Sequence, residues 1–241
     1  MSTPTPTLLS PTASKARITT DEKLLLGLVV ASVVLMNVPY GHYPLYPFKL
    51  FATWIHETFH GLAAIATGGS VQSIDINADT SGLTRSFLSP TVWSQGLVSS
   101  MGYMGTALVG AMLLSMRRHA KVQRWTLFVI ALGMVGSLVF WVRNPFGMVT
   151  TAVLAVGIGF LALRGNDRWA SIGTNVLASQ ACINALLDIR VLYSVQGQSD
   201  AAAMATSVGL WPWFWATLWL VSSLVLFWVA WSRTAARAVP P

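Results

Sequence analysis

Residues 50–65 read LFATWIHETFHGLAAI, and this stretch decides what kind of protein the chain is. It is apolar apart from one cluster, in which His56, Glu57 and His60 form an HExxH motif. On a helix, residues four apart share a face, so the two histidines can hold one metal ion from the same side. Ionisable groups are costly in a bilayer and are rarely there without a function. The stretch therefore predicts a metal site on a membrane helix, with Glu57 as general base.

The composition is that of an integral, multi-pass membrane protein. Of 241 residues, 54% are hydrophobic and 10% are charged, whereas a soluble domain carries about 25% charged residues. The net charge of +7 comes mostly from basic residues between apolar segments, where they set orientation and contact anionic lipid. We therefore expect the lipid bilayer, and no nucleic acid, as a partner. The single cysteine, Cys182, excludes an intramolecular disulfide.

Seven apolar stretches approach the roughly 20 residues that a bilayer-crossing helix needs. They are residues 22–38, 48–67, 92–114, 123–142, 146–163, 169–189 and 210–231. The fourth and fifth are separated only by Arg143-Asn144-Pro145, which is either a tight turn or a kink. We expect an all-α polytopic membrane protein with about six to seven transmembrane helices. No small-x-small cleavage site follows the first stretch, which favours a retained span over a signal peptide.

The domain organisation is simple. We expect a disordered tail at residues 1–20, a single transmembrane metalloprotease-like unit at residues 21–235 and a short tail at residues 236–241. Gly68-Gly69 ends the HExxH helix, and alternating apolar residues on both sides of a polar turn follow. They predict a short interfacial β-hairpin at about residues 69–88, with a plain loop as the alternative.

Two further patterns concern helix packing and the membrane interface. Gly102, Thr106 and Gly110 recur every four residues, a small-residue face for close packing that we expect to lie against the HExxH helix. Tryptophan prefers the headgroup level of a bilayer, so the tryptophans near both ends of the last span predict aromatic belts. They are Trp211, Trp213, Trp215 and Trp219 near one end and Trp228 and Trp231 near the other.

The third metal ligand has to come from another segment, because catalytic zinc usually takes three protein ligands and leaves a fourth position for water. The other histidines, His42 and His119, lie in predicted loops. Most carboxylates lie at the N-terminus, in the hairpin or in short loops, and Asp200 lies in a polar loop. Asp188 differs because it ends the apolar run at residues 181–187. We therefore predict Asp188 as the third ligand.

Spacing supports this choice. Gln180, Asn184 and Asp188 are four apart and form one polar stripe, which we expect to face the HExxH helix. Asn184 is then placed to orient a ligand or to bind the substrate carbonyl as a catalytic residue. The alternative is that Asp188 pairs with Arg190 at a helix end. Asn144 is a second polar candidate, for which a helix-capping role is favoured over a catalytic one.

At these residues the chain resembles the site-2 protease group of intramembrane zinc metalloproteases, and within it the bacterial subfamily B-like branch of peptidase family fifty. The matching segments are His56-Glu57-x-x-His60 with residues 61–64, then residues 67–69, 81–84, 102–105, 186–190 and 199–201. The resemblance implies that His56 and His60 bind Zn²⁺, that Glu57 is the base and that a late aspartate, mapped to Asp188, completes the site. Better-known members carry that aspartate in an Asn-Pro-Asp-Gly or Leu-Asp-Gly motif, and this chain has neither.

The resemblance also implies a function. We expect a zinc metalloendopeptidase of regulated intramembrane proteolysis in the bacterial cytoplasmic (inner) membrane, which hydrolyses a peptide bond within or near a transmembrane segment of a membrane-protein substrate. The alternative is a catalytically inactive relative that binds and sequesters partner membrane proteins, although the intact Glu57 argues against it. A metal transporter fits poorly, because only one span carries a metal-binding motif. Because a helix hides its backbone, cleavage requires local unwinding, and the hairpin edge is expected to accept the unwound segment as an added strand.

Overall fold

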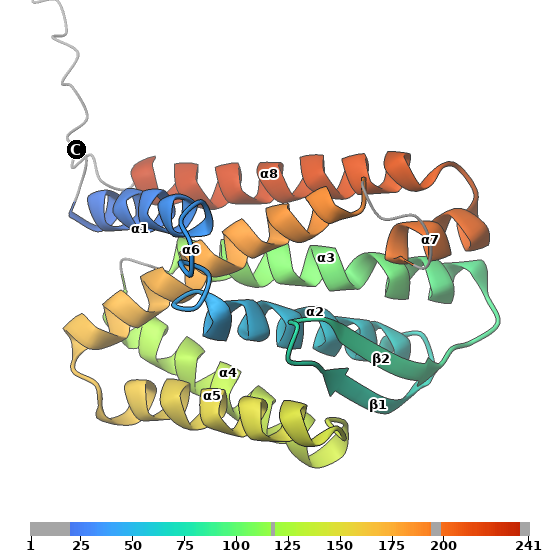
Figure 1. The fold of residues 1–241 in the computed structure, drawn as a ribbon, viewed down its shortest axis with the longest axis horizontal. Helices are drawn as coiled ribbons and strands as arrows, with labels where there is room; N and C mark the ends of the chain where they lie inside the picture. Colours follow the sequence, from blue (N-terminus) through green and yellow to red (C-terminus); the bar gives the residue numbers. More distant parts are fainter. Residues whose placement is uncertain (1–19, 117–118, 194–198, 237–241) are drawn as a thin grey trace, which may run out of the picture.

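The computed structural model describes residues 20–116, 119–193 and 199–236, which form eight helices and one two-stranded sheet (Figure 1). The helices are α1 Thr20–Met36, α2 Tyr46–Ala66, α3 Val92–Ser115, α4 Ala120–Phe140, α5 Pro145–Arg164, α6 Asp167–Val191, α7 Asp200–Val208 and α8 Pro212–Ala236. The strands are β1 Ser70–Ile76 and β2 Gly82–Phe87. Apart from one residue each, the expected tails lie outside the described residues.

All seven apolar stretches predicted from the sequence are helices, and the mostly helical fold is confirmed. Four of the described helices, α3, α4, α5 and α8, are long and apolar enough to cross a membrane. Helix α1 contains a shorter apolar segment, Lys23–Met36. Helix α2 is continuous, but its apolar sequence contains the polar HExxH cluster. The total of six to seven membrane-crossing helices therefore stays a prediction. The short helix α7 was not predicted.

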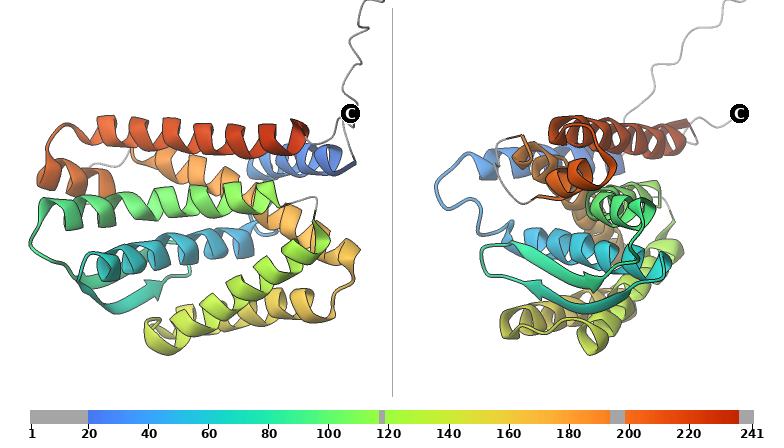
Figure 2. Two further views of the ribbon diagram at one scale, coloured as in Figure 1. Left: turned by 180° about the vertical axis from the view of Figure 1, so that it is seen from behind. Right: turned by 90° about the vertical axis from the view of Figure 1, so that its right-hand side faces the viewer.

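Helix α3 is the centre of the fold. It contacts α2, α6, α7 and α8, while α1 packs on α6. The α4–α5 hairpin and α8 lie on opposite sides of the α2–α3 pair (Figures 1 and 2). The residues between α4 and α5 thus form a turn rather than a kink. This arrangement brings α7, late in the chain, next to the early helices.

The small-residue face of α3 is confirmed as a close-packing face. A Cβ added at Gly102 would lie 2.5 Å from the His56 Nε2 atom on α2, and one at Gly110 would lie 3.0 Å from the Cys182 sulfur on α6. Both distances are shorter than ordinary van der Waals contact, so these glycines let the helix axes approach closely. The central helix can therefore reach the HExxH residues of α2.

The hairpin lies where the sequence predicts it. Strands β1 and β2 pair antiparallel, with Ile74 opposite Thr84 and Ile76 opposite Gly82. Gly68 leaves α2 with a φ of 81°, a conformation that favours glycine. Ile74 and Ile76 are fully buried and anchor β1 to the helices.

The outer edge of β1 is occupied by the turn between α4 and α5. The Ile74 amide donates to the Trp141 carbonyl at 2.8 Å, and the Arg143 amide donates to the Ile74 carbonyl at 3.2 Å. The Asn144 side chain continues the ladder: its Oδ1 accepts from the Ile76 amide at 3.0 Å and its Nδ2 donates to the Ile76 carbonyl at 2.6 Å. Asn144 stands at the N-cap of α5 without a capping hydrogen bond, because its side chain pairs with the strand instead.

The tryptophan prediction is wrong for one residue. Trp211 and Trp213 are 62% and 56% exposed, as an aromatic belt requires. Trp219 is only 3% exposed and stacks on Tyr103 of α3, with ring centroids 5.2 Å apart. It belongs to the protein core around α3 rather than to the lipid-facing surface.

Candidate metal centre

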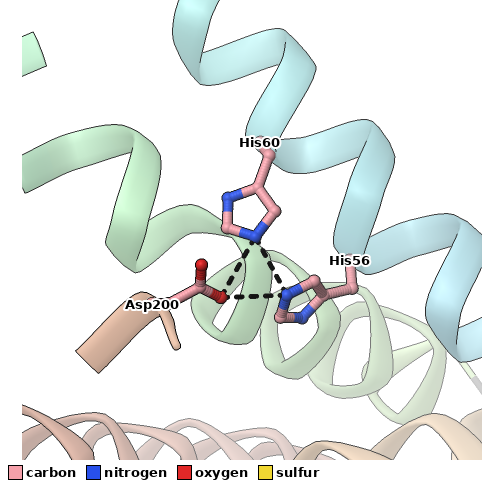
Figure 3. A group of neighbouring side chains, drawn as sticks. All are labelled: His56, His60 and Asp200. Atoms are coloured by element: carbon pink, nitrogen blue, oxygen red, sulfur yellow. Dashed lines mark hydrogen bonds and ion pairs between the residues drawn. The ribbon is translucent and has the colours of Figure 1, made fainter. Parts of the chain in front are cut away.

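Three side chains from two distant segments meet beside α3. The Nε2 atoms of His56 and His60 are 2.9 Å apart, and the Asp200 Oδ2 atom lies 3.1 Å from the first and 3.2 Å from the second. Figure 3 shows the three side chains pointing toward one another, the histidines from α2 and the aspartate from the start of α7. Among the described residues, this is the one group of three or more His, Cys, Asp or Glu side chains close enough to hold a metal ion.

The donor set fits a metal ion. Tetrahedral zinc with bonds of about 2.0–2.1 Å keeps neighbouring ligand atoms about 3.3 Å apart. The three observed separations of 2.9, 3.1 and 3.2 Å are close to that value. Two imidazole nitrogens and one carboxylate oxygen also form a known catalytic zinc set that leaves one position open.

Contacts around the histidines fix their orientation. The Nδ1 atom of His60 lies 2.6 Å from the Val98 carbonyl oxygen of α3. If Nδ1 carries the proton and donates it there, Nε2 keeps its lone pair for the ion. The His56 ring meets Tyr103 edge-to-face, with centroids 4.7 Å apart and planes at 88°. Helix α3 thereby orients both imidazoles.

Gly102 leaves the space that a metal ion would need. A Cβ at this position would lie 2.5 Å from the His56 Nε2 atom and closer still to that of His60. Any side chain would therefore compete with the ion for its ligands. From the sequence, Gly102 was expected to serve helix packing, and the structure adds a role at the site.

Strand β2 covers Glu57 and fixes its side chain. The residue is 6% exposed, and the Thr84 hydroxyl lies 2.8 Å from both its Oε2 atom and its carbonyl oxygen. A Cβ at Gly82 would lie 2.5 Å from the Glu57 Oε1 atom. Because β2 lacks a side chain there, the carboxylate fits beneath the strand, next to the histidines.

Asp200 opens α7, where sequence reasoning predicted only a polar loop. Ser199 caps this helix by accepting a hydrogen bond from the Ala202 amide at 3.2 Å. Burial raises the pKa of Asp200, but the neighbouring His60 and His56 side chains outweigh that effect and hold the pKa below its usual range. A metal ion binds the ionised form of such a carboxyl. A signal was present: a serine before an Asp- and Ala-rich run is a typical helix start.

One cavity of about 1060 Å³ joins the cluster to its surroundings. It is lined by the metal-site residues, by Gly82, Leu83 and Thr84 of β2, by Tyr103 and by parts of α6 and α7. The site is therefore open to a chain segment that lies along β2. The two histidines, Glu57 and strand β2 of the hairpin all line this cavity.

The three residues of the predicted polar stripe on α6 lie in three different environments. Asp188 lines the cavity but does not belong to the cluster of ligand atoms, and it forms no hydrogen bond or ion pair with the described residues. Asn184 is 1% exposed, lies outside the cavity lining and donates to the Gln180 carbonyl at 2.8 Å. The Gln180 side-chain amide donates a hydrogen bond to the Ser32 hydroxyl of α1. Eight residues of helix extend about 12 Å, so only one end of the stripe reaches the site.

The model of the Peptidase M50B-like family matches residues 25–230, nearly the whole described chain. No curated protein and no solved structure matches the chain. The chain therefore belongs to the Peptidase M50B-like family, within the site-2 protease group.

Proposed function

We propose that this protein is an intramembrane zinc metalloendopeptidase that hydrolyses a peptide bond within or near a transmembrane segment of a membrane-protein substrate. One observation carries the proposal: the ligand atoms of His56, His60 and Asp200 converge within a single cavity that Glu57 also lines. Family membership supports the reaction class.

In this proposal His56, His60 and Asp200 hold the zinc ion. Asp200 takes the place that the sequence assigned to Asp188, because its Oδ2 atom is 3.1–3.2 Å from both histidine nitrogens and Asp188 stands outside the group. A zinc ion bound there would make water a nucleophile at neutral pH and would polarise the scissile carbonyl.

Glu57 moves the proton. Its Oε2 atom accepts the Thr84 hydrogen bond, while Oε1 forms no hydrogen bond with the described residues. Oε1 can therefore take a proton from the attacking water and deliver it to the departing amine. Thr84 keeps the carboxylate in one orientation through both transfers.

Strand β2 is proposed to receive the unwound substrate. The α4–α5 turn occupies the outer edge of β1, whereas in the described chain β2 pairs only with β1. Residues 82–84 of β2 also line the cavity. An extended segment added to this edge would pass beside Glu57 and the histidines, which is how a strand edge binds a peptide.

The second candidate is a non-catalytic protein that sequesters membrane partners. One assay separates the two: purified wild type, Glu57→Gln and a control, Asp167→Asn on the surface, are compared for cleavage of a panel of single-span substrates. We expect wild type and Asp167→Asn to cleave at least one substrate and Glu57→Gln to bind zinc without cleaving. Substrate binding without any cleavage by the wild type would favour sequestration.

A further inference from the structure

Peptide hydrolysis develops negative charge on the carbonyl oxygen, and a hydrogen-bond donor aimed at that oxygen accelerates the reaction. The sequence assigned this role to Asn184, which the structure buries outside the cavity. The donor has to come from the cavity wall itself. Two candidate hydroxyls there are already engaged: Thr84 bonds Glu57, and Thr53 bonds the Thr80 carbonyl at 2.7 Å.

Tyr103 supplies an unengaged donor. It lines the cavity, yet its hydroxyl forms no hydrogen bond with the described residues. The hydroxyl oxygen also keeps contact with solvent and is not sealed in the protein interior. A tyrosine hydroxyl in a protein interior usually finds a partner. An open, unpaired one beside a metal cluster therefore points to a ligand.

The ring of Tyr103 is fixed in place from two sides. One face stacks on Trp219, with planes at 15°, and the ring meets the His56 imidazole edge-to-face at 4.7 Å. Tyr103 follows Gly102, at which a Cβ would lie 2.5 Å from the His56 Nε2 atom and closer still to that of His60. The side chain is only 9% exposed and has two torsions to fix, so the hydroxyl is positioned before substrate arrives.

We propose that Tyr103 is a catalytic residue whose hydroxyl donates a hydrogen bond to the oxygen of the scissile carbonyl as negative charge develops there. This inference rests on the proposed peptidase function. The tyrosine keeps its proton, and no bond to it is made or broken. Loss of one such donor from a water-poor site lowers kcat by about 10²- to 10³-fold.

The test is Tyr103→Phe, which keeps both ring contacts and removes only the hydroxyl. We expect kcat to fall by about 10²-fold or more, with KM and zinc content unchanged. The matched control is Tyr193→Phe, which removes a hydroxyl bonded to Thr217 outside the cavity and should leave kcat unchanged.

A second measurement separates catalysis from a structural role. Tyr103→Phe should weaken binding of a peptide phosphinate, which mimics the tetrahedral oxyanion, by the same factor as kcat/KM. Substrate binding to Glu57→Gln should not change when Tyr103→Phe is added. Three results would overturn the inference without affecting the proposed function. They are a wild-type kcat in Tyr103→Phe, loss of zinc from Tyr103→Phe, and equal weakening of phosphinate binding and substrate binding. A wild type that binds no zinc and cleaves nothing would overturn the proposed function as well.

Discussion

At the scale of single residues, Gly102 links backbone geometry to metal binding most directly. Its missing side chain leaves free the space into which the Nε2 atoms of His56 and His60 point. In most helices glycine is unfavourable relative to alanine by about 1 kcal/mol, so replacing it usually stabilises the helix. At this position a Cβ would stabilise the helix but would occupy space at the candidate metal site.

Gly102→Ala is therefore expected to weaken zinc binding by more than the roughly 10- to 100-fold that outer contacts of a metal site typically cost. The control is Gly157→Ala on α5, where a Cβ would meet nothing within 4 Å. Zinc content and thermal stability should be measured together. Stoichiometric, tight zinc in Gly102→Ala would show that the ion does not lie where these ligands converge.

At the scale of elements, the hairpin and the HExxH helix were predictable because each is encoded locally. The alternation around the turn at residues 77–81 gives the strands, and four-residue spacing gives the histidine face. Helix α7 escaped prediction because nine residues are too few to span a bilayer, and its one local signal is the Ser199 N-cap. The role of Asn144 escaped too, since its strand partner, Ile76, is 68 residues away.

Proline placed in β2 tests this strand as the substrate edge. Leu83 and Ser86 are three apart, so in an antiparallel ladder one amide points toward β1 and the other toward the free edge. Of the two proline variants, the one that loses the amide on the free edge should keep its zinc. Its cleavage rate should fall by about tenfold or more, which corresponds to the loss of one good hydrogen bond. If Leu83→Pro and Ser86→Pro both keep zinc and cleave like the wild type, the edge is not used.

At the scale of the whole molecule, the proposed third ligand follows from the packing of helices rather than from local pattern. Asp188 satisfies every local criterion, with an apolar helix and a polar stripe at the right spacing. Asp200 meets His56 across 144 residues of sequence because α7 packs on α3, which also packs on α2. One sequence cannot reveal which of two aspartates a tertiary contact selects. Within the family resemblance, the match at residues 199–201 points to the second.

The most direct measurement is therefore the zinc content of wild type, Asp200→Asn and Asp188→Asn, purified in parallel in the same detergent. Both substitutions keep the size of the side chain and remove its charge, so the two aspartates are compared on equal terms. We predict one zinc per chain in wild type and in Asp188→Asn, and loss of most zinc in Asp200→Asn. Full zinc in Asp200→Asn together with loss in Asp188→Asn would contradict the account, as would a wild type that binds no metal.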